Sequence, residues 1–66
     1  MKISVNGRST EVPDGIVMSA LLASLELTGQ RLAVEVNEEL VARSRFEEHR
    51  LASGDRVEII HAVGGG

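Results

Sequence analysis

The sequence predicts an α+β fold in which a mixed sheet of about five strands packs against one main helix. Short runs that alternate between apolar and polar residues recur near both ends of the chain, whereas one segment between them has apolar residues at helical spacing. The first run contains an Asn-Gly pair, which is a strong short-range signal of a β-hairpin. A chain of 66 residues has room for one domain with a small core.

Residues 1–12 predict the N-terminal hairpin. Every second residue from Met1 to Val5 is apolar, and the alternation resumes from Thr10 to Val12. Asn6-Gly7 between the two runs supplies the positive-φ positions that a type I′ turn requires. Pro13-Asp14-Gly15 then ends the second strand, because proline has no amide donor for a ladder and Asp-Gly favours a turn.

The next segment predicts the helix. Its apolar residues lie at positions i, i+3, i+4 and i+7 and so form one stripe, namely Met18, Leu21, Leu22 and Leu25. Gly29 is the expected terminator. Val17 stands where Ser, Thr or Asp would cap the helix, so its first amides are expected to bond to Asp14 or to water.

Two further strands are predicted before an irregular connection. Leu32–Val36 alternates with its apolar residues on one face, Asn37-Glu38-Glu39 reads as a turn, and Leu40-Val41 reads as a short strand. A charged segment follows, in which Phe46 and Leu51 are expected to pin the connection to the core.

Ser53-Gly54-Asp55 turns the chain into the last strand. Val57, Ile59 and either His61 or Val63 are its expected inward residues, and the outward ones are Glu58, Ile60 and Ala62. Because Ile60 makes the outward face partly apolar, we expect this strand to be central in the sheet. The long route from the first strand allows the two to pair in parallel. This is the β-grasp arrangement, with the domain spanning residues 1–63.

Residues 64–66 form a predicted flexible tail, and its terminal carboxylate is the best candidate reactive group. Glycine has no Cβ, so Gly64, Gly65 and Gly66 could thread a slot too narrow for side chains and expose the last carbonyl to attack. On a central strand the tail would project by roughly 10 Å from a fixed base. Taken alone, however, it is equally well explained as a frayed end.

Composition narrows the function classes. The chain has no cysteine and therefore no disulfide, thiolate metal site or cysteine nucleophile. The net charge of −3 disfavours a nucleic-acid partner and instead suggests a partner protein with a basic surface. The apolar runs are far shorter than a membrane span, and no signal peptide opens the chain, so a soluble cytoplasmic protein with no membrane partner is expected.

Neither the side chains nor the motifs suggest catalysis or cofactor binding by the chain itself. His49 and His61 lack metal-ligand spacing, so no metal site is expected. The pairs Glu38-Glu39 and Glu47-Glu48 read as surface charge. Without a GxGxxG motif or P-loop, the chain should not bind ATP alone.

Over essentially its whole length the chain resembles the ThiS family, sulfur-carrier proteins of thiamine thiazole synthesis within the ubiquitin-like β-grasp group. The resemblance rests on the order and spacing of several motifs, which are Asn6-Gly7, Val12-Pro13-Asp14-Gly15, Leu21-Leu22, Ala33-Val34-Glu35-Val36-Asn37, Val41-Ala42-Arg43-Ser44, Gly54-Asp55-Arg56-Val57-Glu58-Ile59 and Ala62-Val63-Gly64-Gly65-Gly66. Val17 and Phe46 depart from it, since the family often has a capping Thr and a Trp or Tyr there.

The resemblance implies a cycle run by partner enzymes. An adenylyltransferase resembling the ubiquitin activators would use ATP and Mg²⁺ to adenylate the Gly66 carboxylate. Sulfur from a cysteine desulfurase or another persulfide donor would replace AMP and leave a thiocarboxylate. Thiazole synthase would accept that sulfur. The chain would then be a protein co-substrate and not an enzyme.

For partner docking we expect the outward end of the last strand, Ile60, Ala62 and Val63, to act together with the tail. Two alternatives stay open. The small subunit of molybdopterin synthase shares the fold and the thiocarboxylate, and a ubiquitin-like interaction or modifier module would carry an inert tail or one that is conjugated to a lysine.

Overall fold

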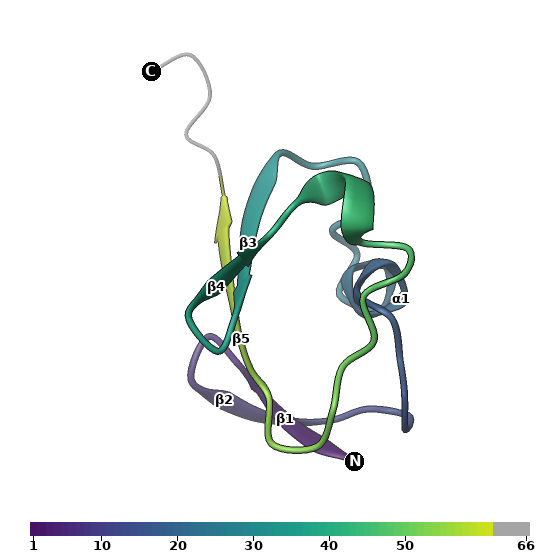
Figure 1. Cartoon of the computed structure of the whole chain (residues 1–66), viewed down its shortest axis with the longest axis vertical. Coiled ribbons are helices and arrows are strands. Elements are labelled where there is room, and N and C mark those ends of the chain that lie inside the picture. Colours follow the sequence, from purple (N-terminus) through teal and green to yellow (C-terminus); the bar gives the residue numbers. More distant parts are fainter. Residues whose placement is uncertain (62–66) are drawn as a thin grey trace.

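The computed structural model describes residues 1–61 and shows a five-stranded mixed sheet with one α-helix packed across it (Figure 1). In chain order the elements are β1 (Lys2–Val5), β2 (Arg8–Glu11), α1 (Met18–Ser24), β3 (Leu32–Val36), β4 (Glu39–Val41), the short 3₁₀ helix η1 (Arg43–Arg45) and β5 (Arg56–His61). The strand order across the sheet is β2-β1-β5-β3-β4. The predicted fold class is confirmed, including the parallel pairing of the first and last strands at the centre.

The N-terminal hairpin forms as predicted. β1 and β2 are antiparallel, with Val5 opposite Arg8, so Asn6 and Gly7 form a two-residue turn. Their φ angles are 51° and 82°, the left-handed values that a type I′ turn needs and that Asn and Gly tolerate best.

The N-terminus of α1 is held by the connection that precedes β5. Val17 is the N-cap residue, and its side chain makes no capping hydrogen bond. Instead, the Met18 amide donates to the His49 carbonyl at 2.8 Å, and the Ser19 amide donates to the Phe46 carbonyl at 2.9 Å. The expectation of Asp14 or water as acceptor is wrong for these two amides, because carbonyls distant in the sequence satisfy them.

Asp14 has a different partner. Its carboxylate lies 3.1 Å from the Met1 amine, which also lies 3.4 Å from the Glu11 carboxylate and donates to the Val12 carbonyl at 2.7 Å. The terminal ammonium therefore binds the end of β2 and the turn that follows it.

The helix ends at Ser24, well before the predicted terminator Gly29. The Glu26 amide donates to the Ala23 carbonyl at 3.0 Å, and the Leu27 amide donates to the Leu22 carbonyl at 2.9 Å. With Glu26 at φ 61°, this is a Schellman motif. The expectation of Gly29 as terminator is wrong, because Glu26 takes the left-handed position that glycine usually occupies.

The turn between β3 and β4 is one residue shorter than predicted. Val36 pairs with Glu39, so Glu39 belongs to β4 and the turn consists of Asn37 and Glu38. Their φ angles of 52° and 72° are those of a second type I′ turn. A glutamate at positive φ is uncommon, which is why the sequence did not indicate this turn type.

Both predicted anchors of the connection are confirmed. Leu51 is buried, and its amide donates to the Ile16 carbonyl at 2.9 Å. Phe46 is half-buried against the core, directly after η1. The connection is therefore packed against the domain, although η1 itself was not predicted.

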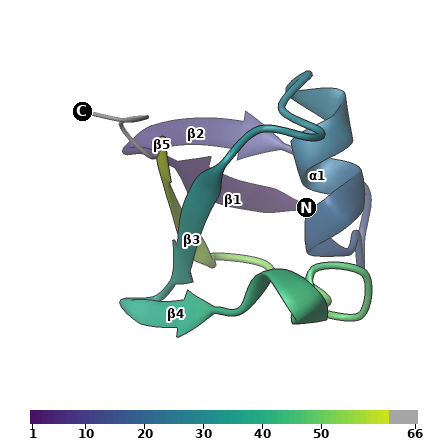
Figure 2. The ribbon, with the colours of Figure 1, turned by 90° about the horizontal axis from the view of Figure 1, so that it is seen from above.

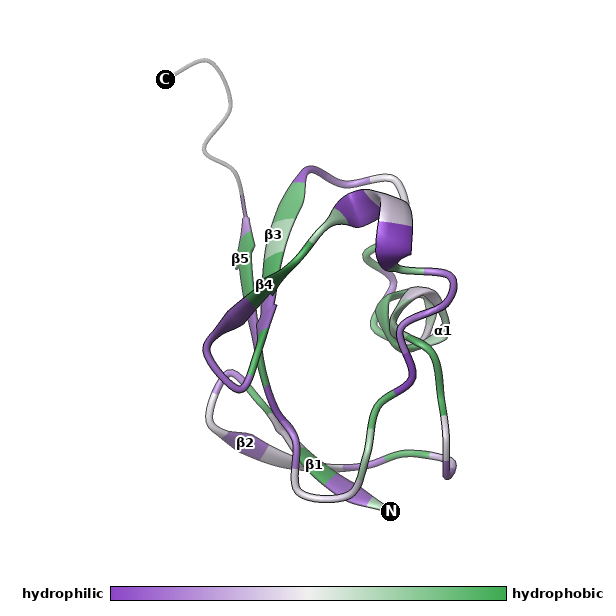
Figure 3. Ribbon diagram, viewed as in Figure 1, coloured by the Kyte–Doolittle hydropathy of each residue, from purple (hydrophilic) through white to green (hydrophobic). Residues whose placement is uncertain are grey.

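The core lies between α1 and one face of the sheet, and the other face of β3 and β5 carries no covering element among residues 1–61 (Figure 2). Its buried residues are Ile3, Val12, Met18, Leu21, Leu22, Val34, Val36, Val41, Leu51, Val57 and Ile59. Figure 3 shows hydrophobic stretches in α1 and in the central strands, whereas η1 is largely hydrophilic. Within residues 1–61, no helix is long and apolar enough to cross a membrane.

Candidate functional site

Most of the predicted site residues belong to the last segment of the chain. Gly64, Gly65 and Gly66, together with the docking residues Ala62 and Val63, lie outside the residues that the structure describes. Their roles, and the division into a domain of residues 1–63 and a tail of residues 64–66, stay predictions. Ile60 lies within the described part, on the strand that leads to them.

β5 forms a fixed base for the residues that follow it. It pairs in parallel with β1 on one side and antiparallel with β3 on the other. The pairing with β3 continues to the last residue of the strand, where His61 lies opposite Leu32. The side chains of Val57 and Ile59 are buried in the core. The chain therefore leaves the sheet from a central strand, at the end of the molecule opposite the N-terminus (Figure 1).

The uncovered face of the sheet, here called the outer face, carries Ile60 as predicted. Ile60 is 53% exposed and lies opposite Ala33 of β3, which is also exposed. Its inward neighbour Ile59 is 6% exposed. The predicted alternation of β5 is confirmed over these residues. His61, which was expected to point inward as an alternative to Val63, is exposed at the end of the strand.

Leu40 is a second apolar residue of the outer face that sequence reasoning did not assign to the site. It is 72% exposed and lies opposite Glu35, which in turn lies opposite Glu58 of β5. The signal that could have found it is strand alternation, because a buried Val41 places Leu40 on the opposite face.

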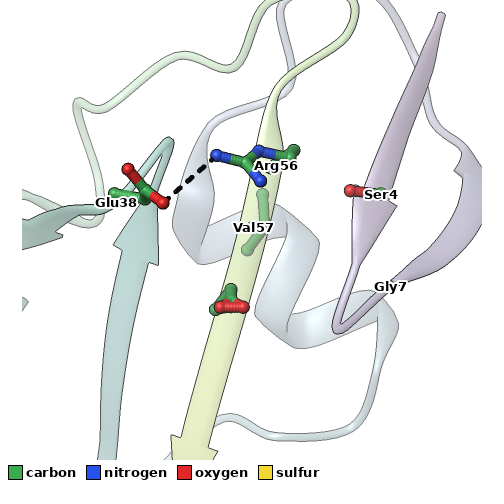
Figure 4. A pocket seen from close by; sticks show the side chains of 6 residues that line it. Ser4, Gly7, Glu38, Arg56 and Val57 are labelled. Carbon is green, nitrogen blue, oxygen red and sulfur yellow. Dashed lines mark ion pairs between the residues drawn. The ribbon is translucent and has the colours of Figure 1, made fainter.

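Acidic residues border these apolar positions. Glu58 is exposed and Glu35 half-buried on the outer face, and Glu38 in the turn after β3 pairs with Arg56 at 3.6 Å (Figure 4). Since both members of this ion pair are largely exposed, it contributes little to stability. The outer face thus combines exposed aliphatic side chains with a predominance of negative charge.

The surface pockets of the described residues are small. The pocket drawn in Figure 4 has a volume of about 140 Å³ and is lined by Ser4, Gly7, Glu38, Arg56, Val57 and Glu58. Two others, of about 100 and 280 Å³, lie beside α1 and β4. All three fall below the roughly 300–1,000 Å³ of typical small-molecule sites.

The residues considered for acid-base or metal chemistry are dispersed. Glu38, Glu39, Glu47 and Glu48 are all exposed, as expected for surface charge, and Glu48 pairs with Arg45 at 2.7 Å. His49 is half-buried beside the start of α1, whereas His61 is exposed at the end of β5. Among residues 1–61 there is no group of three or more His, Asp or Glu residues placed to hold a metal ion.

Known proteins resemble the chain in both sequence and structure. A family model described as the ThiS family matches residues 3–66. The sulfur carrier protein ThiS of Bacillus subtilis is 35% identical over 65 residues, which cover 97% of this chain and 98% of that protein. The crystal structure of a thiamine biosynthesis protein (ThiS) from Geobacter metallireducens has a TM-score of 0.87 and 30% identity, with 100% of both chains covered.

Some relatives are much longer. Proteins named thiazole synthase from Paramagnetospirillum magneticum and Magnetococcus marinus are each 33% identical over 66 residues, which is 100% of this chain. The chain spans only 20% of the length of either protein, so each contains a segment similar to the whole of it. From the match over residues 3–66 and the shared β-grasp structure, the chain belongs to the ThiS family and has its ubiquitin-like fold.

Proposed function

We propose that this chain is a sulfur carrier of thiamine biosynthesis whose Gly66 carboxylate is converted to a thiocarboxylate. The similarity to the Bacillus subtilis sulfur carrier over 97% of the chain carries the proposal. The position of β5 supports it, because a central strand gives the segment that ends at Gly66 a fixed base.

Adenylation would be the first step. An adenylyltransferase similar to ubiquitin activators would bind ATP and Mg²⁺ in its own active site. The Gly66 carboxylate would attack the α-phosphate, and pyrophosphate would leave. The resulting mixed anhydride has AMP as a good leaving group, whereas the free carboxylate is inert toward nucleophiles. The chain would contribute the carboxylate and a tail of glycines, whose lack of side chains permits close approach of the backbone.

Sulfur would enter in the second step. The terminal sulfur of a persulfide, formed by a cysteine desulfurase or another donor, would attack the acyl carbon and displace AMP. A thiol would then cleave the S–S bond, leaving the thiocarboxylate on Gly66 and a disulfide on the donor side. No side chain of the carrier needs to move a proton in either step, so the chain would act as a co-substrate of its partners.

Thiazole synthase is the proposed acceptor. The two thiazole synthases that contain a segment similar to this chain support this choice, because carrier and acceptor would then be parts of one polypeptide in those proteins. The match to the ThiS family likewise favours thiazole formation over molybdopterin synthesis or an inert interaction module.

The outer face would supply the docking surface for these partners. Ile60 and Leu40 provide exposed aliphatic area, and Ala62 and Val63 are proposed to extend it toward the tail. Because Glu58 is exposed and Glu35 lies beside Leu40, a partner with basic groups around an apolar centre would be complementary.

Removal of Gly66 tests the proposed function. In a reaction with the adenylating enzyme, ATP, a desulfurase with ³⁵S-labelled cysteine, and thiazole synthase with its other substrates, the full chain should transfer label to the thiazole product. The chain ending at Gly65 should fold normally and transfer at least about 100-fold less, because its carboxylate falls short of the reactive position. Equal transfer by the two chains would contradict the assignment of Gly66.

A further inference from the structure

The two sides of β5 are supported differently. On the β3 side, pairing continues from Val57 to His61. On the β1 side, strand pairing covers only Ser4 with Arg56 and Val5 with Val57, after which β1 turns away at its hairpin. The second half of β5 therefore extends beyond its parallel neighbour, and this half leads to the tail.

The side chain of Asn6 takes the place of the missing strand. The Asn6 amide donates to the Val57 carbonyl at 2.8 Å, which continues the β1 ladder by one bond. Its side-chain Oδ1 accepts from the Ile59 amide at 2.7 Å, and its Nδ2 donates to the Ile59 carbonyl at 3.3 Å. One carboxamide thus satisfies both backbone groups of Ile59, as a neighbouring strand would.

Asn37 makes a similar contact at the other end of the same strand. Like Asn6, it is the first residue of a two-residue hairpin turn, and its φ of 52° nearly equals the 51° of Asn6. Its Oδ1 accepts from the Arg56 amide at 2.9 Å, and its own amide donates to the Arg56 carbonyl at 2.8 Å. Figure 4 shows β5 running between these two turns, marked by Glu38 and Gly7.

We propose that Asn6 is a positioning residue for the carrier reaction: its carboxamide holds β5 at Ile59 and thereby fixes the direction in which the chain leaves the sheet toward Gly66. This inference rests on the proposed function. Orientation of a reacting group strongly affects the rate of a bound reaction. If the contact with Asn6 were lost, the chain could bend at Ile59, and its carboxylate would reach the partner's active site in a productive orientation less often. Asn37 holds only the start of β5 and should have no such effect.

The matched pair Asn6→Gly and Asn37→Gly tests this inference. Glycine tolerates the positive φ of both turns, so each variant loses a carboxamide without straining its hairpin. Amide hydrogen exchange should quicken about tenfold at Ile59 in Asn6→Gly and at Arg56 in Asn37→Gly. Thermal unfolding of both variants sets a temperature at which each is fully folded.

Adenylation kinetics supply the decisive readout. With the chain as the varied substrate of the adenylating enzyme, Asn6→Gly should lower kcat about tenfold and leave KM nearly unchanged, because the outer face still docks. Asn37→Gly should keep both constants within about twofold of the wild type. Asn6→Asp keeps an acceptor for the Ile59 amide but no donor, so its kcat should be intermediate. Asn6→Asp serves as the test variant if Asn6→Gly does not fold.

Equal kinetics for the Asn6 and Asn37 variants, with the wild-type chain adenylated normally, would overturn the positioning role alone. So would a rise in KM with kcat unchanged, since that would place Asn6 in docking. A wild-type chain that is not adenylated at all would instead overturn the proposed function.

Discussion

The Met1 ammonium joins the start of β1 to the end of β2 and the turn beyond it. The hydrogen bond to the Asp14 carboxylate raises the pKa of the Met1 amine above its ordinary value of 8.0, and the Glu11 carboxylate acts in the same direction, while burial opposes both. A raised pKa means that the folded state binds the amine proton more tightly than the unfolded state does. The stabilisation is therefore fully present below pH 8.0 and is lost as the pH rises through the folded-state pKa.

We predict a loss of stability at alkaline pH that depends on Asp14. Urea unfolding of the wild type should show a midpoint that falls from pH 8.0 upward, as the Met1 amine of the folded protein deprotonates. The Asp14→Asn variant should start from a lower midpoint and lose less over the same range. As a control, the intact mass of each protein should be measured to verify that Met1 is present. Parallel curves for the two proteins would show that Asp14 does not hold the ammonium.

On the scale of elements, the outer end of β5 is the place where the fold exposes apolar surface beside the outgoing chain. Ile60 is directed away from the core by strand alternation, and its neighbour across the sheet is the small residue Ala33. A charge at this position would meet solvent in the free protein but would be desolvated under a docked partner.

Replacement of Ile60 with Asp should therefore raise KM for the adenylating enzyme about tenfold or more and change the free energy of unfolding by less than about 1 kcal/mol. Ala20→Asp is the control, since it places the same charge on the exposed side of α1. Enzyme kinetics and urea unfolding measure the two effects. If Ile60→Asp unfolds the domain or leaves KM at the wild-type value, the outer face is not the docking surface.

The elements themselves were predictable wherever local chemistry decides them. Asn6-Gly7 indicated the first hairpin correctly because both residue types tolerate positive φ. Asn37 and Glu38 adopt nearly the same turn, but a positive φ is unfavourable for glutamate, so the residue type at position 38 did not indicate this turn. Glu26 likewise ends α1 in a position that glycine usually fills.

What the sequence could not indicate depends on non-local partners. The amides of Met18 and Ser19 find acceptors in the connection before β5, and no local pattern encodes which carbonyls fold back onto a helix end. The Ile59 contact of Asn6 is of the same kind, because it joins a turn at one end of the chain to a strand at the other. Of the candidate site, Ile60 was predictable from alternation, and the same reasoning extended to β4 would have found Leu40.

At the scale of the whole molecule, the last strand, β5, lies at the centre of the sheet, and the chain leaves the sheet from its end. The parallel pairing of β1 and β5 makes this possible, since the intervening residues supply the crossover and the helix that covers one face. The other face of β3 and β5 carries no covering element among residues 1–61, which leaves it free for the proposed docking. This arrangement supports the proposed carrier function, in which several partner enzymes would act on the Gly66 carboxylate in turn.

The most direct measurement uses the absence of cysteine from the chain. The protein is incubated with the adenylating enzyme, ATP, Mg²⁺ and a cysteine-driven desulfurase, then treated with a thiol-alkylating reagent and analysed by intact mass and peptide mapping. Alkylation is essential, because exchange of oxygen for sulfur adds nearly the same mass as oxidation of Met1 or Met18. The account predicts a single alkyl adduct that maps to Gly66 and disappears when ATP is omitted. An active partner enzyme that yields no adduct, or an adduct elsewhere in the chain, would contradict it.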